Sequence, residues 1–344
     1  MAITDPDLTR IGRDPLWFAH RYDPGQDAVH FLRLSRDVHR AATFVTDEYL
    51  PADAAKLVLR RQDVMAAAPL PAPVHFIFHS AYCCSTLLAR ACDLEGVAMG
   101  LKEPPWFNDL VGWKQRGGTP REIAAVLDDG LTLLARPFGP GEAVVIKPSN
   151  VANAFAPAML TMRPRARALL LHAPLEAYLG SIVRKGMWGR LWVRDLLVKQ
   201  LGDGLHDLGF TPTDYLGQTD LQVAAMGWLA QHALFARMVD SFGSNRVRTL
   251  DSETLVAQPV AIMRALATLF GLKLSEAAVA AVVTGPAFAT HSKFGRAFGA
   301  EARTAEQADT AALHRDEIDK VVVWTTAVAA SAGVSMTPPA PLLG

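Results

Sequence analysis

The stretch FIFHSAYCCSTLLARACD, residues 76–93, decides the fold. It continues an apolar run of β-branched and aromatic residues at 74–78, which is typical of a buried strand. A tight turn follows, and the signals of a helix begin at Ser85. A strand that leads through a turn into a helix directs backbone N–H groups and the positive end of the helix dipole to one place. This layout is that of a phosphate-binding loop.

The turn lacks most residues of the nucleotide-hydrolase loop, which follows the pattern GxxxxGK[ST]. The two glycine positions fall on His79 and Cys84, and the lysine position falls on Ser85. Only Thr86 fits, because it supplies the final hydroxyl. The sequence therefore argues against an ordinary ATPase or GTPase. A kinase that uses ATP is a weaker alternative, since Asp251 alone follows a predicted strand as a carboxylate that could hold magnesium.

The composition indicates a globular protein of one large or two modest domains, with 344 residues of which 50% are hydrophobic. Lys and Arg together number 34, as do Asp and Glu, and this balance argues against a general nucleic-acid binder. The three cysteines and the scattered histidines lack the spacing of a disulfide framework or a metal site. No signal peptide and no apolar run of ~20 residues is recognisable. We therefore expect a cytoplasmic protein that uses no metal and binds no membrane.

Short apolar segments alternate with helical patterns along the chain. Strands are predicted at residues 74–78, 96–101, 143–146, 168–171 and 246–250. One helix begins at a capping box of Thr119 and Glu122, and others are predicted at 259–270 and 304–333. Strands that alternate with helices indicate parallel pairing. The predicted fold class is therefore α/β, with a parallel β-sheet flanked by helices on both faces in a three-layer sandwich like that of P-loop nucleotide kinases.

Two regions depart from this alternation. Residues 1–70 are predicted as a helical or irregular extension, in which 27–49 show helical spacing of apolar side chains. The proline-rich segment AAAPLPAP at 66–73 reads as a linker. We therefore place the α/β domain at 71–335, with a helical insertion at about 186–245.

Polar side chains gather where the predicted strands end. They are found at 80–86, at 102–103, at 147–149, at His172 and at Asp251. Ligands of parallel sheets bind at the carboxyl ends of the strands. Some polar residues must stand there in any parallel sheet, so the pattern favours a site at this edge without requiring one.

Residues 79–88, HSAYCCSTLL, resemble the 5′-phosphosulfate loop of the sulfotransferases, which is typically GxP[RK]SGT[TS]LL. The tail STLL fits, whereas Tyr82 stands at the position of the cation and Cys84 at that of the glycine. The resemblance covers about residues 74–300, and TLDSETLVAQPVAIMRALATLFGL at 249–272 adds a further structural signature of the family. It identifies the chain as a divergent member. The resemblance implies that the loop binds the 5′ end of the sulfuryl donor, 3′-phosphoadenosine 5′-phosphosulfate. The loop residues that it implies are Ser80, Tyr82, Cys83, Cys84, Ser85 and Thr86.

Two further segments carry the catalytic residues that the resemblance implies. In LKEPPWF, residues 101–107, Glu103 is similar to the general base of tyrosylprotein-type members. In VIKPSN, residues 145–150, Lys147 matches the lysine that steadies the bridging oxygen of the donor. The alternative for Glu103 is a solvated turn residue, and for Lys147 it is an ordinary lysine at a strand end.

The 3′-phosphate of the donor would be held by two more segments. LLLHAPLEAYLGSIVRKG, residues 169–186, resembles the family's RxPxDxxxS segment, with His172 in place of the arginine. Ser181 and Arg184 lie one helical turn apart and could grip a phosphate together. The segment THSKFGRAF, residues 290–298, adds Lys293 and Arg296. The alternatives are an amphipathic helix for the first segment and a basic surface loop for the second.

The remaining unusual residues have simpler explanations. The pair Cys83 and Cys84 fits small side chains at glycine-like positions better than a nucleophile. Trp188 and Trp192 recur at helical spacing and fit a core stripe better than an acceptor pocket. Their roles in binding are left open.

The resemblance implies an enzyme that transfers a sulfuryl group from 3′-phosphoadenosine 5′-phosphosulfate to a hydroxyl or amine of a small-molecule acceptor. The alternative is a non-catalytic relative that binds a nucleotide or a protein partner, which the departures at Tyr82, Cys84 and His172, and at Ser149 in place of the family's catalytic histidine, favour. The sequence indicates neither the acceptor nor an oligomeric state.

Overall fold

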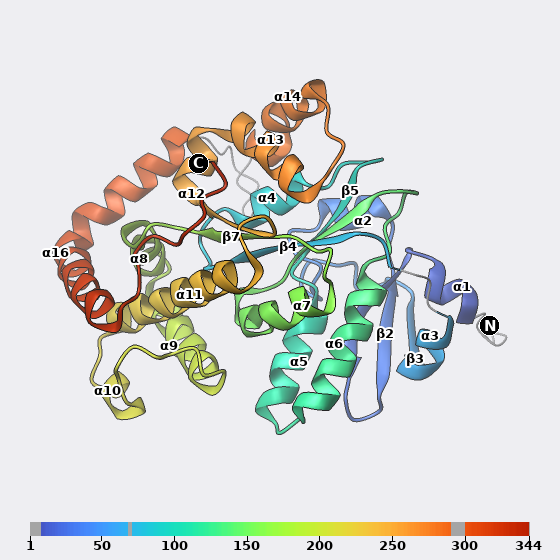
Figure 1. The fold of residues 1–344 in the computed structure, drawn as a ribbon, viewed down its shortest axis with the longest axis horizontal. Coiled ribbons are helices and arrows are strands. Elements are labelled where there is room, and N and C mark those ends of the chain that lie inside the picture. Colours follow the sequence, from blue (N-terminus) through green and yellow to red (C-terminus); the bar gives the residue numbers. More distant parts are fainter. Residues whose placement is uncertain (1–7, 68–70, 290–299, 344) are drawn as a thin grey trace. The chain divides into compact units, whose positions relative to one another are not determined.

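The computed structural model describes residues 8–67, 71–289 and 300–343, and its largest sheet has the five strands predicted. The strand order is β5-β6-β4-β7-β8, and the pairs β4–β6, β5–β6 and β7–β8 are parallel. The strands are β4 (Val74–His79), β5 (Ala98–Lys102), β6 (Ala143–Lys147), β7 (Ala168–His172) and β8 (Val247–Asp251). Helices flank this sheet (Figure 1), so the predicted α/β fold class is confirmed.

The burial of the strands explains their sequences. Every residue of β4, β5, β6 and β7 is buried. Strands that are covered on both faces read as continuous apolar runs instead of alternating ones. The first of these strands along the chain, β4, has two strands on either side of it in the sheet, so the loop after it starts at the centre of the sheet.

The main helices begin where the sequence signals place them. In α6 (Pro120–Leu134), Thr119 and Glu122 form the predicted capping box. The predicted helix at 259–270 is α13 (Pro259–Phe270), and the last helix, α16 (Ala300–Ala332), begins four residues before its predicted start. The region predicted as a helical insertion holds α9 (Gly186–Gly202), α10 (Pro212–Leu216) and α11 (Asp220–Phe242).

Shorter helices complete the chain. They are α1 (Leu8–Arg13), α3 (Arg61–Ala67), α4 (Ser85–Ala91), α5 (Pro105–Gln115), the 3₁₀ helix η1 (Asn150–Phe155), α7 (Ala156–Met162), α8 (Leu175–Arg184), α12 (Ser252–Ala257), α14 (Glu276–Thr284) and α15 (Pro286–Ala289). Within the described ranges, every helix is too short or too polar to cross a lipid bilayer.

The prediction of helical structure at residues 27–49 is wrong. Three strands form an antiparallel sheet near the N-terminus, namely β1 (Trp17–Asp23), β2 (Ala28–Arg33) and β3 (Lys56–Arg60). Only α2 (Arg36–Ala41) is helical within 27–49. Four of the six residues of β2 are buried, including neighbours that point to opposite faces. Such a doubly covered strand also satisfies helical spacing, and pairing with β1 and β3 decides between the two.

The chain divides into two compact units. Unit 1 contains the described residues of Met1–Ile77, Thr86–Arg167 and Phe270–Lys273, and unit 2 contains those of Phe78–Ser85, Ala168–Leu269 and Leu274–Gly344. The antiparallel sheet with α1 and α3 therefore belongs to unit 1, whereas α8, α9, α11 and α16 belong to unit 2.

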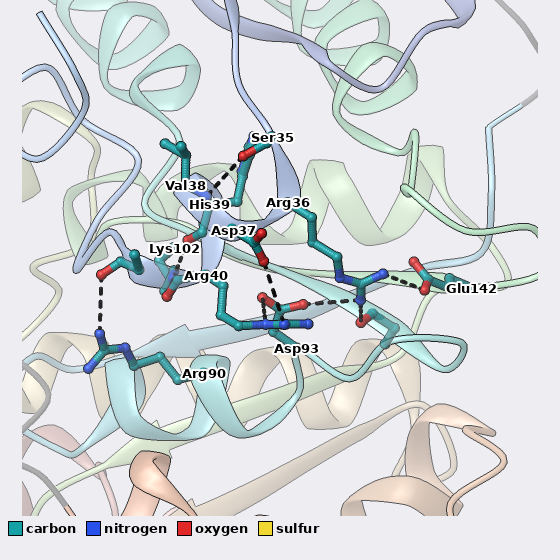
Figure 2. Close-up of polar contacts among 12 residues, drawn as sticks. Ser35, Arg36, Asp37, Val38, His39, Arg40, Arg90, Asp93, Lys102 and Glu142 are labelled. Atoms are coloured by element: carbon teal, nitrogen blue, oxygen red, sulfur yellow. Dashed lines mark hydrogen bonds and ion pairs between the residues drawn. The ribbon is translucent and has the colours of Figure 1, made fainter.

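In unit 1, ion pairs fasten α2 to neighbouring segments (Figure 2). Arg36 donates one hydrogen bond to Glu142 at 2.6 Å and another to Asp93 at 3.2 Å, and the carboxylates of both are almost completely buried. The ammonium of Lys102, at the end of β5, donates to the backbone oxygen of His39 at 2.6 Å. Burial lowers the pKa of Lys102 to about 8. These contacts satisfy charges that would otherwise be costly to bury.

In unit 2, the C-terminal tail runs beside the outer strand of the sheet. The backbone N–H of Thr249 donates to Ala340 at 2.9 Å, and that of Leu342 donates to Thr249 at 2.8 Å. The hydroxyl of Thr249 donates to Pro339 at 2.8 Å. The tail thus covers the edge of β8, which would otherwise expose unpaired backbone groups. Helix α16, which precedes the tail, packs against α8 and α11 (Figure 1).

Candidate functional site

The loop between β4 and α4 has an unusual backbone. Ala81, Tyr82 and Cys84 have φ values of 74°, 53° and 61°, in the left-handed region that favours glycine. Each such residue costs ~1–3 kcal/mol and persists where the surrounding structure holds it, often at functional sites. Residues of opposite handedness in succession curve backbone N–H groups into the concavities that bind anions. The loop therefore holds three non-glycine residues in left-handed conformations, a kind of strain that clusters at functional sites, with Cys84 in a conformation that favours glycine.

Neighbouring groups hold this loop in place. The backbone N–H of Ser80 donates to the backbone oxygen of Leu171 at 3.0 Å, and the thiol of Cys83 donates to the same oxygen at 3.4 Å. The backbone N–H of Ala81 donates to His79 Nδ1 at 3.1 Å. Cys83 is 1% exposed, so it fills space under the loop as expected for a small buried side chain. Cys84 is half-buried.

Tyr82 stands where the resembling family has a cation, and it is part of an aromatic cluster. Its ring lies 6.0 Å from that of Tyr178 and 5.5 Å from that of Trp192, the second contact being edge-to-face. Burial raises the pKa of Tyr82 to about 12, so its hydroxyl is neutral at pH 7. This position of the loop therefore carries no charge.

The cluster continues along α9 to the surface. Trp192 stacks on Trp188 with 6.4 Å between ring centroids and 12° between ring planes. Trp188 is 60% exposed, so the prediction of a core stripe is wrong for it. The helical spacing that suggested a core arises because the two indoles stack on each other at i and i+4. Aromatic surface thus extends from Tyr82 at the loop to Trp188 in solvent.

The two hydroxyl residues at the end of the loop are buried. Ser85 begins α4 and is 6% exposed, and Thr86 follows at 3%. Ser85 belongs to unit 2 and Thr86 to unit 1.

In unit 1 the structure brings the two predicted catalytic residues together. Glu103 and Lys147 follow and end the neighbouring strands β5 and β6. The ammonium of Lys147 donates to a carboxylate oxygen of Glu103, and the backbone N–H of Glu103 donates to the backbone oxygen of Lys147 at 2.7 Å. Lys147 is 1% exposed and also lies 5.1 Å from the ring centroid of Phe44. Glu103 has a left-handed φ of 56°, which marks a second strained backbone position.

The predicted 3′-phosphate residues are placed only in part. On α8, Arg184 donates a hydrogen bond to the hydroxyl of Ser181 at 3.0 Å, and this hydroxyl donates to Ala177 at 2.9 Å. Ser181 is buried and Arg184 is exposed, so the guanidinium reaches solvent from a fixed position on the helix. Lys293 and Arg296 lie outside the described residues.

His172, the other predicted residue of this group, has different surroundings. It ends β7 beside Asp251 at the end of β8, and its Nδ1 is 3.8 Å from Asp251 Oδ2, which is too long for a hydrogen bond. The His232 ring lies 5.0 Å away. Burial lowers the pKa of His172, and Asp251 opposes this effect only in part. His172 is therefore neutral at pH 7.

His172 and Asp251 line a cavity of about 550 Å³ in unit 2, whose other walls the sequence did not indicate. These walls include Trp228 of α11 and the C-terminal tail. No local pattern of the sequence indicates that the indole of Trp228 or the proline-rich tail approaches this place. His172 and Asp251 could be named in advance, because each stands at the end of a predicted strand.

Other chemistry has little support from the described side chains. In the part of the chain that the structure describes, no three His, Cys, Asp or Glu residues come together in a way that could hold a metal ion. Cys83, Cys84 and Cys92 are free thiols. Burial raises the pKa of Cys92 to about 12, which makes this thiol unreactive at pH 7.

No known family model and no curated protein sequence matches this chain. Several solved structures are similar to it. The sulfotransferase domain of the Synechococcus olefin synthase is 14% identical, with a TM-score of 0.38 over 63% of this chain and 79% of that chain. A Mycobacterium avium sulfotransferase is 15% identical, with a TM-score of 0.41 over 72% and 78%. An Alicyclobacillus acidocaldarius sulfotransferase is 17% identical, with a TM-score of 0.37 over 72% and 96%. These three structures are of sulfotransferases or of a sulfotransferase domain.

Proposed function

We propose that the protein transfers a sulfuryl group from 3′-phosphoadenosine 5′-phosphosulfate to a hydroxyl or amine of a small molecule. The observation that supports this most is the loop after β4, where Ala81, Tyr82 and Cys84 hold left-handed backbone conformations without glycine. The same loop carries the sequence likeness to the 5′-phosphosulfate segment. A strained loop of this kind, made without glycine, is hard to explain as a mere connection.

The donor would be held at its reactive end by this loop. Backbone N–H groups of residues 82–86 and the hydroxyls of Ser85 and Thr86 would bind the 5′-phosphosulfate, while those of Ser80 and Ala81 hold the loop itself. Because Tyr82 is neutral, positive charge has to come from another side chain, and we assign this role to Lys147. The transfer forms a bond from the acceptor oxygen or nitrogen to sulfur while the bond from sulfur to the bridging phosphate oxygen breaks. The leaving product is adenosine 3′,5′-bisphosphate.

The ion pair of Glu103 and Lys147 suggests how the two groups share this step. While they are paired, the ammonium neutralises the carboxylate. A leaving phosphate oxygen that takes the place of the carboxylate on Lys147 would release Glu103, which could then accept the proton of the acceptor. The ammonium would thus face the charge that develops on the leaving group at the moment when the carboxylate is needed for the proton, as transition-state stabilisation requires.

The 3′-phosphate would be held mainly by Arg184, which Ser181 orients through the hydrogen bond at 3.0 Å. Lys293 and Arg296 are proposed as further contacts. His172 cannot replace the arginine of the family as a charge, because burial keeps it neutral at pH 7.

Calorimetry with adenosine 3′,5′-bisphosphate tests the donor site. The wild-type protein should bind this ligand more tightly than adenosine 5′-monophosphate, which lacks the 3′-phosphate. Arg184→Ala should remove the difference between the two ligands. An absence of heat with folded protein at millimolar bisphosphate would contradict the proposal.

A second candidate function is nucleotide or partner binding without catalysis. The neutral Tyr82 at the cation position of the loop favours it. Radiolabelled sulfate transfer to a panel of phenols, alcohols and amines separates the two candidates. Bisphosphate binding without transfer to any acceptor would favour the non-catalytic one.

A further inference from the structure

Unit 2 contains a cavity whose chemistry does not suit a phosphate. Its volume is about 550 Å³, within the range of small-molecule sites. It lies at the carboxyl ends of β7 and β8, against the first turn of α8, Trp228 of α11 and the C-terminal tail. Most of its lining is apolar, with Leu175, Leu250, Val322, Met336 and Leu342 among the contributors. A ligand there would bury a largely hydrophobic body.

The ionisable residues that line the cavity are His172, Glu176 and Asp251, beside three threonines. His172 Nδ1 has no hydrogen-bond partner among the described residues, and the side chain is only 7% exposed. Asp251 Oδ2 is 3.8 Å from this nitrogen, and the carboxylate of Glu176 also lines the cavity. No lysine or arginine occurs among the described lining residues. An anion would therefore meet two carboxylates and no cation.

The walls of the cavity are held before any ligand binds. Trp228 Nε1 donates to the backbone oxygen of Ala173 at 2.9 Å, which fixes the indole. Thr249 holds the C-terminal tail through its backbone and its hydroxyl. Asp251 accepts a hydrogen bond from the backbone N–H of Glu253 at 2.7 Å, so its carboxylate is oriented as the cap of α12. Little conformational freedom is left to lose on binding, which favours affinity.

We propose that this cavity binds an apolar small molecule that carries one protonated amine. An ammonium ~2.9 Å from each acceptor can bridge two atoms that are 3.8 Å apart. It would donate one hydrogen bond to His172 Nδ1 and another to Asp251 Oδ2. This contact satisfies the buried imidazole nitrogen and neutralises one carboxylate, while the apolar body displaces water from the hydrophobic walls. This inference does not rest on the proposed sulfuryl transfer.

Three indole compounds that differ in one group test the proposal by calorimetry with the full chain at pH 8. Tryptamine carries an ammonium, tryptophol a hydroxyl and indole-3-acetate a carboxylate. Tryptamine should bind at least tenfold more tightly than tryptophol, and indole-3-acetate should bind most weakly. Equal affinities, a preference for the acid, or no heat from any compound with folded protein would overturn the proposal.

Two variants test whether the compounds bind in this cavity and whether their amine contacts Asp251. Asp251→Asn keeps the cap of α12 but removes the charge, so it should abolish the preference for tryptamine over tryptophol. Val322→Phe narrows the cavity and should weaken the binding of both tryptamine and tryptophol. Asp240→Asn, at an exposed position of α11, is the matched control and should leave the affinities unchanged. If Asp251→Asn keeps the amine preference, or if Val322→Phe binds like the wild type, the ligand site lies elsewhere and the inference fails.

Discussion

Replacing Glu103 and Lys147 by methionine, singly and together, measures what their ion pair contributes. Methionine keeps much of the length of both side chains and removes their charge. Lys147 is 1% exposed in its side chain and Glu103 is 19% exposed. Loss of the carboxylate therefore leaves an almost fully buried ammonium, whereas loss of the ammonium leaves a carboxylate that water can reach.

This difference in exposure sets the order of the effects on the free energy of unfolding. Glu103→Met should cost ~3–5 kcal/mol, the usual penalty for one uncompensated buried charge. Lys147→Met should cost less, ~1–3 kcal/mol, because the remaining carboxylate is partly hydrated. The double variant should lie within ~1 kcal/mol of the wild type, since two apolar side chains of similar volume replace a buried pair with little net loss. Every one of these variants should lack sulfuryl transfer.

Urea denaturation followed by tryptophan fluorescence gives the three free energies and, by difference, the coupling energy of the pair. The slope with urea has to be the same in all variants for the comparison to hold. Effects that simply add, with a coupling energy below ~0.5 kcal/mol, would refute the idea that the buried pair holds both groups in place. Full transfer activity in the double variant would refute their catalytic roles independently of stability.

Three more predictions concern unit 1 and the loop. Arg36→Met removes the guanidinium that pairs with the buried carboxylate of Glu142 and leaves buried Asp93 with Arg40 alone, at 3.8 Å, so it should cost ~3–5 kcal/mol in urea denaturation, whereas Asp37→Asn, at a 91% exposed side chain, should change nothing measurable. Cys84→Gly should raise the free energy of unfolding by ~1 kcal/mol because φ is 61° there, while Cys83→Gly should lower it; equal effects would contradict the backbone argument. Burial and the nearby Lys102 lower the pKa of His39 to about 3, so the unfolded chain takes up the proton first and stability falls by ~1.4 kcal/mol per unit as pH drops from 6.5 towards 3. His39→Phe, packed by Phe18 and Phe138, should reduce this slope between urea curves at pH 8 and pH 5, and an unchanged slope would exclude His39 as its source.

The larger sheet and its helices could be predicted because, in each of these elements, the sequence pattern of the segment itself indicates the structure that the segment adopts. The five apolar runs are short and bounded by polar residues. The capping box at Thr119 directly predicts where α6 begins. The antiparallel sheet near the N-terminus was missed because Phe31 and Leu32 fit a helical stripe as well as a doubly buried strand. Pairing with β1 and β3, which are separate in the sequence, makes that choice.

The sequence predicted which polar residues of the candidate site stand at strand ends. It did not predict which of these residues contact each other. Glu103 and Lys147 were named separately, and only the register of β5 and β6 shows that one side chain reaches the other. The surroundings of His172 were unpredictable for the same reason. Its charge state depends on Asp251, which lies 79 positions later, and on burial by elements that no local pattern connects to it.

The loop after β4 holds three left-handed backbone positions, none of which is a glycine. Ala81, Tyr82 and Cys84 hold left-handed conformations because Ser80 and Cys83 are tied to the backbone oxygen of Leu171. Tyr82 contributes aromatic contacts in place of charge, and an arginine there would bury a guanidinium among the rings of Tyr178 and Trp192. Tyr82 therefore fills this position with aromatic packing and without charge, and the binding of an anion here would have to rely on other groups of the chain.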